Sequence, residues 1–160
     1  MIKRLRKGLL LCLLMGSYPA WASCWEEVAG RYDIEPELLK AIAVVESGAR
    51  AGAMNPGNSD GSRDIGLMQI NSMHLPRLAK QGITEERLLT EPCLSIEVGA
   101  SILADFIQRF GYNWTAVGSY NAGPAPEREA LRLRYAEKIW AQYEALSLIH
   151  ISEPTRRRGI

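Results

Sequence analysis

The chain has 160 residues, of which 47% are hydrophobic, and its 19 Lys and Arg residues against 18 Asp and Glu residues give a formal net charge of +1. This composition excludes a disordered tail, a collagen and a protein with many membrane spans, and it is typical of one soluble domain. The charges are unevenly placed, because basic segments at both ends flank an acidic central part. We therefore expect three parts with different roles.

Residues 1–22 have the order of a secretory signal peptide. Four basic residues precede an unbroken apolar run over residues 9–15, and Ala20-Trp21-Ala22 then has the small-x-small pattern of a cleavage site. The run is well short of the roughly 20 residues that a membrane anchor needs. A lipoprotein cleavage box ending at Cys24 is the other alternative, but Trp21 stands where an aliphatic residue is usual. We predict export to the periplasm, with cleavage near Ala22.

The segment 147–160 breaks the amphipathic pattern before it. Residues 148–160 resemble the translated read-through of a sequencing adapter more than a protein module, and we interpret 147–160 as a non-native tail. An Arg-rich tail that binds an acidic partner is the functional alternative. Without both ends, residues 23–147 hold 12 basic and 17 acidic residues, a net charge of −5. An acidic body disfavours nucleic acid, whose phosphates need a basic patch.

Cysteine usage agrees with export. Cys12 lies within the signal segment, so the exported chain would retain the even pair Cys24 and Cys93 in an oxidising compartment. We predict a disulfide between these two residues, which contributes roughly 4 kcal/mol in the chain-entropy model by closing a loop of about 70 residues. Two distant Cys and two His residues do not form a ligand set, so no metal or other cofactor is expected.

Residues 23–146 are predicted to form one mostly helical domain. The apolar spacing and the breakers predict helices over residues 25–32, 36–47, 94–110, 114–121 and 126–146, and short helical segments over 65–72 and 84–89. Residues 51–64 are instead rich in Gly, Asn, Pro, Asp and Ser, which predicts a loop or small hairpin. An EF-hand fails here, because the pattern would place Pro56 and Leu67 at ligand positions.

Glu46 is the first candidate for catalysis. It falls within the apolar arc of the helix over 36–47, four residues after Ile42 and in the last turn. Burial and the helix dipole both disfavour its charged form and so raise its pKa. A carboxyl group still protonated near neutral pH suits a general acid at a glycosidic oxygen. The structural alternative is an ion pair with Arg50, Arg63 or Arg109.

Asp64 is the second candidate, 18 residues further along in the polar stretch. If this stretch folds back over the helix end, Asp64 and Glu46 would face each other across a cleft, an arrangement common in glycosidases. The open alternative is that Asp64 caps the short helix that follows.

Three segments carry a resemblance to a known family. They are Val45-Glu46-Ser47, Gly66-Leu67-Met68-Gln69-Ile70-Asn71 and Ala116-Val117-Gly118-Ser119-Tyr120-Asn121-Ala122-Gly123. In this order they are similar to the signature segments of the soluble lytic transglycosylase domain, and the match spans nearly all of residues 24–146. With the signal segment, the small size and the cysteine pair, the chain most resembles the murein-cleaving enzymes that accompany type III secretion, type IV secretion and conjugation machines.

The resemblance implies roles for individual residues. Glu46 would be the catalytic acid and base, and Ser47 after it would support the local geometry. Gln69 would hydrogen-bond a sugar N-acetyl or hydroxyl group, Tyr120 would lie over the acid and orient it, and Asn121 would hold the substrate. The structural alternatives are a helix-end hydroxyl for Ser47, a surface amide for Gln69 and a core aromatic for Tyr120.

The resemblance also implies a fold and an activity. The fold would be α+β and predominantly α-helical, lysozyme-like, with a small irregular or β region beside the catalytic helix. The activity would be cleavage of the MurNAc-β-1,4-GlcNAc bond of peptidoglycan to 1,6-anhydroMurNAc ends, opening the wall locally for a secretion, conjugation or pilus apparatus. The expected partners are glycan strands and components of that apparatus, with exposed residues of 127–146 as docking candidates, and the protein itself is expected to be a monomer.

One stretch departs from the transglycosylase pattern. Residues 58–72 are similar to the strand-turn segment of animal-type lysozymes, with Asp64 at the place of their second carboxylate and Glu46 at the place of their acid. This similarity leaves open a lysozyme-type muramidase that hydrolyses the same bond with Glu46 and Asp64. A non-catalytic glycan-binding module is the alternative of another class, and it would not need a protonatable residue at position 46.

Overall fold

The computed structural model describes residues 23–152, so the predicted signal segment and residues 153–160 of the predicted tail lie outside the described residues. It confirms the expected α+β, predominantly helical fold. The helices are α1 (Cys24–Tyr32), α2 (Pro36–Ser47), α3 (Leu75–Ala79), α4 (Glu85–Thr90), α5 (Pro92–Phe110), α6 (Trp114–Ala122) and α7 (Glu129–Ser152), with 3-10 turns η2 (Ser72–His74) and η3 (Pro126–Arg128). The strands are β1 (Met54–Asn55), β2 (Asp64–Ile65) and β3 (Ile70–Asn71).

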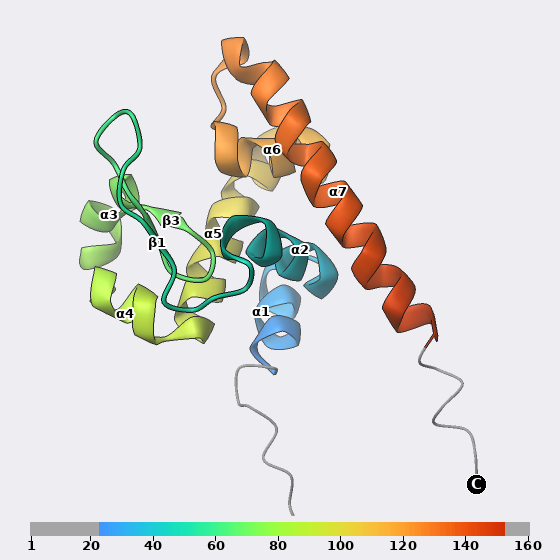
Figure 1. Ribbon diagram of the computed structural model, residues 1–160, viewed down its shortest axis with the longest axis horizontal. Helices are drawn as coiled ribbons and strands as arrows, with labels where there is room; N and C mark the ends of the chain where they lie inside the picture. The colour runs from blue at the N-terminus through green and yellow to red at the C-terminus, as the bar shows by residue number, and fades with distance from the viewer. Residues whose placement is uncertain (1–22, 153–160) are drawn as a thin grey trace, which may run out of the picture.

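The helices pack around α2 and α5. The small sheet lies with α3 and α4 on one side of the molecule, and α7 runs along α2 and α6 on the other (Figure 1). Fully buried side chains from these elements form one apolar core, among them Leu39, Ile42, Ile96, Leu103 and Ile139. Within residues 23–152, no helix is both long and apolar enough to cross a membrane. The core therefore fixes α2 between the sheet on one side and α7 on the other.

Helix α2 begins and ends where the sequence predicts. Pro36 occupies its first turn, and Gly48 closes it in a left-handed conformation at φ 64°. The N–H of Gly48 donates to the carbonyl oxygens of Ala43 and Val44, so the helix stops in a defined turn. Glu46 is thereby placed in the last turn, beside the sheet.

The prediction of a short helix over residues 65–72 is wrong. This segment is instead a tight turn between β2 and β3, with Ile65 opposite Ile70 in the antiparallel register. Gly66 at φ 75° and Gln69 at φ 47° are left-handed, a conformation that no right-handed helix contains. The predicted hairpin in 51–64 is confirmed, because β1 pairs antiparallel with β2.

The C-terminal helix also differs from the prediction. It begins as η3, becomes α7 at Glu129 and continues to Ser152, six residues beyond the expected end at Leu146. After Leu146 the sequence has no Gly or Pro until Pro154, so no helix-breaking residue ends the helix at 146. The helical conformation becomes unfavourable only at the residue before Pro154. Helix α3 was not anticipated at all. The native or non-native origin of residues 147–160 stays a prediction.

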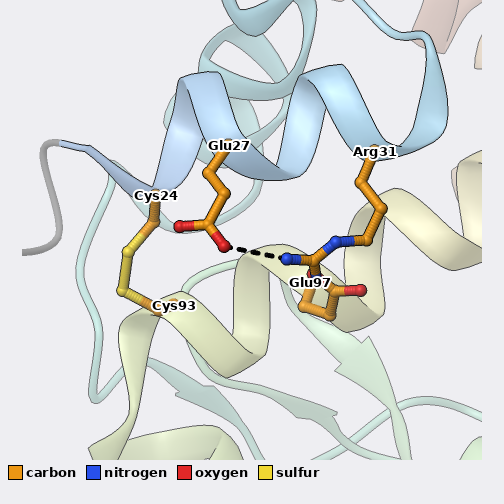
Figure 2. The surroundings of a disulfide bond; sticks show 5 residues. All are labelled: Cys24, Glu27, Arg31, Cys93 and Glu97. Carbon is orange, nitrogen blue, oxygen red and sulfur yellow. Dashed lines mark hydrogen bonds and ion pairs between the residues drawn. A yellow bond between two sulfur atoms is a disulfide. The ribbon is translucent and has the colours of Figure 1, made fainter.

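The predicted disulfide joins Cys24 at the start of α1 to Cys93 at the start of α5, with Cα atoms 5.6 Å apart (Figure 2). A second link lies along the same pair of helices. Arg31 of α1 is paired with Glu27, at 2.9 Å, and with Glu97 of α5. These ion pairs are at least partly exposed and contribute little on their own, so the covalent bond is the stronger of the two links.

Candidate active site

A cavity of about 510 Å³ lies between the sheet, the end of α2, the middle of α5 and the end of α6. Five of the six predicted site residues line it: Glu46, Asp64, Gln69, Tyr120 and Asn121. The other walls are the polar hairpin tip with Asn58, Ser59, Asp60 and Ser62, and the apolar side chains of Ile102 and Phe106. The cavity thus combines a carboxyl group from a helix end with many hydrogen-bonding side chains, which suits a polar ligand such as a sugar chain.

Glu46 is a half-buried acid in this cavity. Burial raises its pKa from 4.5 to about 7, and the nearby charge of Asp64 acts in the same direction. A hydrogen bond from Tyr135 and the charge of Lys138 act against this and limit the rise. The net result is a carboxyl group that is substantially protonated near neutral pH, as general acid catalysis requires.

The alternative of a buried ion pair at Glu46 is not what the structure contains. Arg50 donates from Nε to the carbonyl oxygen of Ser47 at 2.9 Å, and Arg63 pairs with Glu85. Arg109 lies over the ring of Phe110. Among residues 23–152, Glu46 forms no ion pair, which leaves its proton available for chemistry.

Tyr135 on α7 is a site residue that sequence reasoning missed. Its hydroxyl donates to Oε1 of Glu46 at 2.6 Å, and only 6% of the residue is exposed. The available signal was its position, since Tyr135 falls on the buried stripe of α7 with Ala136 and Ile139. A buried tyrosine hydroxyl needs a hydrogen-bond partner, and the carboxyl of Glu46 is that partner here.

Asp64 is held in β2 by three side-chain amides. Its Oδ2 accepts from Asn55 at 3.2 Å and from Asn58 at 3.0 Å, and its Oδ1 accepts from Asn71 at 2.9 Å. Three N–H donors suit an ionised carboxylate, which can only accept. The capping alternative fails, because no helix follows Asp64 directly and the side chain of Asn71 caps η2. The two carboxyl groups therefore line one cavity in unlike surroundings.

Ser47 and Gln69 hold the backbone around the acid. Ser47 is buried outside the cavity lining, and its Oγ donates to the carbonyl oxygen of Leu67 at 2.7 Å, tying the end of α2 to the turn between β2 and β3. The Nε2 of Gln69 donates to the carbonyl oxygens of Gly66, at 2.9 Å, and Ala53, at 3.3 Å, and the residue lines the cavity. The structure thus gives Ser47 a scaffolding position and Gln69 a lining position.

Tyr120 and Asn121 come from the last turn of α6. The hydroxyl of Tyr120 donates to the carbonyl oxygen of Met68 at 2.8 Å, so the hydrogen bond to the acid comes from Tyr135 and not from Tyr120. Burial, followed by the charges of Glu46 and Asp64, raises the pKa of Tyr120 well above its ordinary value, so it stays protonated. Asn121 is exposed at the cavity, where its amide can reach a ligand.

Arg132 supports the wall that follows Asn121, and sequence reasoning missed it as well. It is 7% exposed, and its Nη1 donates to the carbonyl oxygens of Gly123, at 3.2 Å, and Ala125, at 2.6 Å. Its buried Nε has no partner among the described residues. Arg132 thus ties the cavity-lining loop after α6 to the start of α7.

The fold is that of a lytic transglycosylase. The structure of an inactive mutant of the lytic transglycosylase Slt from Pseudomonas aeruginosa superposes with a TM-score of 0.60 over 78% of this chain, at 19% identity. The chain spans 23% of that protein's length. On this fold, an acid of raised pKa in a polar cavity has the chemistry that cleavage of a glycan requires.

The family follows from the sequence comparison. Residues 23–143 match the family described as the transglycosylase SLT domain, and the chain belongs to this family. It is therefore a lytic transglycosylase by family, and membership of an enzyme family disfavours a non-catalytic binding module. The chain is 48% identical to the invasion protein IagB of Salmonella typhimurium over 95% of this chain and 94% of that protein. It is 45% identical to the protein IpgF of Shigella sonnei over 84% of this chain and 87% of that one.

Proposed function

We propose that this protein is a periplasmic enzyme that cleaves the MurNAc-β-1,4-GlcNAc bond of peptidoglycan with Glu46 as its acid and base, producing 1,6-anhydroMurNAc ends. The observation that carries the proposal is the position of Glu46, a carboxyl group with a pKa of about 7 in a polar cavity. One such group can serve both roles, because near neutral pH it can give up a proton and take one back.

The steps balance without water, metal or cofactor. Glu46 donates its proton to the bridging oxygen as the bond between that oxygen and C1 of the muramoyl residue breaks. The positive charge at C1 is stabilised by the N-acetyl group of the substrate. The oxygen of the muramoyl 6-hydroxyl then bonds to C1, and its proton passes to the carboxylate of Glu46, which restores the starting acid.

Asp64 favours a second outcome, hydrolysis of the same bond. Held by Asn55, Asn58 and Asn71, its carboxylate is fixed in the cavity with Glu46. An ionised carboxylate near C1 would stabilise the cation, or bond to it, long enough for water to attack instead of the 6-hydroxyl. Lysozyme divides the work in this way between two carboxyl groups in unlike surroundings. The muramidase is thus the second candidate function.

The names of the relatives support a cellular role. A chain so similar to an invasion protein over nearly its whole length fits a local opening of the wall for a secretion, conjugation or pilus apparatus. The predicted signal segment supports a periplasmic location after cleavage near Ala22, and we expect the enzyme to act as a monomer on glycan strands.

Mass spectrometry of a purified murein digest tests the reaction. We expect predominantly 1,6-anhydro ends, and predominantly reducing ends would instead establish the muramidase. The Glu46→Gln variant serves as the catalytic control and Glu127→Gln, at an exposed position, as the matched control for loss of one charge. Wild-type digestion by Glu46→Gln would refute the role of Glu46.

A further inference from the structure

A second cavity, of about 150 Å³, opens between the start of α2, the end of α5, the start of α6 and the second half of α7. Four aromatic residues, Tyr112, Trp114, Trp140 and Tyr143, form its walls, over an apolar base of Leu38, Ile107 and Val117. We call it the aromatic pocket. None of its lining residues is shared with the catalytic cavity, so it is a separate site.

The ring of Trp114 stands at steep angles to the rings of Trp140 and Tyr143, which themselves meet at 33° with centroids 5.9 Å apart. Trp114 meets Trp140 edge to face, with ring centroids 5.2 Å apart, and it meets Tyr143 at 71° with centroids 6.4 Å apart. Trp114 and Trp140 are 38% and 44% exposed, and Tyr112 is 50% exposed. Such a cluster of exposed large aromatic side chains marks an interaction site more often than an inert surface.

One carboxylate lies among these rings. Oε2 of Glu35 accepts from the hydroxyls of Tyr112 and Tyr143, each at 3.3 Å. Burial is the largest cause that raises the pKa of Tyr143. The charge of Glu35 is the next largest cause and that of Glu37 a smaller one, so both carboxylates act on this pocket. Within residues 23–152, Glu35 forms no ion pair, and it is exposed.

The polar groups of the pocket favour a cation over a sugar. A sugar needs several donors and acceptors at its hydroxyls, but the amide of Asn113, which also lines the pocket, is used at both ends within the protein. Its Oδ1 accepts from the N–H of Ala116, and its Nδ2 donates to the carbonyl oxygen of Phe110. The hydroxyls of Tyr112 and Tyr143 are likewise directed to Glu35. Apart from two indole N–H groups, what remains is one carboxylate with aromatic walls, the combination that attracts an ammonium or guanidinium group.

We propose that the aromatic pocket is a docking site for a basic segment of a partner protein, which inserts one Lys or Arg side chain into the cavity beside Glu35 and against the exposed sides of Trp114 and Trp140. The methylene groups of the inserted side chain would contact the apolar base, and its positive charge would lie against the aromatic rings and the carboxylate of Glu35. The net charge of −5 over residues 23–147 favours the approach of a basic partner. This inference rests on the proposed role at an envelope apparatus and assigns the surface through which the protein would bind to that apparatus.

The pocket lies away from the reacting atoms. Glu35 precedes α2 and Glu46 lies in its last turn, which at about 1.5 Å per residue separates them by roughly 16 Å. Helix α7 likewise carries Tyr135, which is bonded to Glu46, and Trp140, which lines the aromatic pocket. A partner seated in the aromatic pocket therefore leaves the catalytic cavity open for a glycan strand.

The test is a titration of the purified protein with the peptide acetyl-Gly-Arg-Gly-amide, followed through the indole N–H signals of Trp114 and Trp140. The same peptide with neutral citrulline in place of Arg isolates the charge. We expect the Arg peptide to move both signals and the citrulline peptide not to. Glu35→Gln should weaken binding about fivefold, whereas Glu86→Gln, an equal charge change on the distant α4, should not.

Three results would overturn the proposal: equal binding of the citrulline peptide, no effect of Glu35→Gln, or no response to the Arg peptide. A soluble murein fragment that moves the two signals in place of the peptide would likewise overturn it and assign the pocket to the glycan. Murein cleavage by Glu35→Gln is measured in parallel. Retained cleavage shows that the variant is folded, and it separates failure of this proposal from failure of the proposed reaction.

Discussion

Tyr135 and Glu46 are 89 residues apart in the sequence, and a hydrogen bond of 2.6 Å joins the hydroxyl of the first to Oε1 of the second. Burial raises the pKa of Glu46, while this hydrogen bond lowers it by favouring the charged form, and the two together leave it at about 7. The contact between α7 and the end of α2 thus adjusts the proton affinity of the proposed acid.

The activity of the enzyme should therefore fall as the pH rises through about 7, because Glu46 then loses the proton it must donate. In Tyr135→Phe the descending limb of the pH–rate profile should move to higher pH by about one unit, since a hydrogen bond to a charged group is worth roughly 1.5 kcal/mol. The maximal rate should also fall, because the carboxyl is less firmly held. Rates of murein cleavage between pH 5 and 9 measure both effects. Tyr143→Phe, on the same helix but in the aromatic pocket, is the control, and a limb that stays in place in Tyr135→Phe would contradict the role.

Asp64→Asn should move the same limb in the opposite direction. The charge of Asp64 raises the pKa of Glu46, so its removal makes Glu46 a stronger acid and shifts the limb to lower pH. We expect turnover to fall by about tenfold, less than the loss in Glu46→Gln, because in the proposed reaction Asp64 would only stabilise charge at C1 and would not transfer the proton. The ratio of anhydro to reducing ends is measured on the same digests. No shift would show that the charge of Asp64 does not act on Glu46, and a shift upward would contradict the direction of its effect.

Glu46→Gln should abolish turnover and yet stabilise the protein at high pH. The pKa of Glu46 is higher in the folded state, about 7, than its ordinary 4.5, so the folded protein binds more protons in this window and loses stability as the pH rises through it. The variant has no such group, and from pH 4.5 to 8 it should gain about 3 kcal/mol relative to the wild type. Urea unfolding at a series of pH values gives the difference. A difference that is constant with pH would mean that Glu46 is not desolvated in the folded protein.

The sequence allowed good predictions where local signals and burial agree. Pro36 and Gly48 mark both ends of α2, and the apolar arc over Leu38, Leu39 and Ile42 places Glu46 toward the core. The even number of cysteines predicted the bond between Cys24 and Cys93. Each of these features is encoded within one helix or by one residue type, and so it can be recognised without the fold.

The features that were predicted wrongly or not at all depend on contacts between distant segments. Residues 65–72 are apolar enough for a short helix, but the left-handed Gly66 and the pairing of Ile65 with Ile70 make a sheet turn of them. Tyr135 was not recognised as a site residue for the same reason: its place on the buried stripe of α7 was a signal of burial, but its partner lies on another helix and no local pattern links the two. A single sequence does not reveal which polar side chains become partners when distant segments pack together.

Gly66 offers a direct test of that sheet turn. Its φ of 75° disfavours any side chain, and a Cβ there would lie 2.3 Å from the carbonyl oxygen of Leu88 in α4. Gly66→Ala should therefore cost at least about 3 kcal/mol, from the backbone conformation and the collision together. Gly61 has a similar φ of 81° with open space around it, so Gly61→Ala should cost only about 1 kcal/mol. Urea unfolding of both variants separates the two causes. Equal losses would mean that α4 is not packed against the turn.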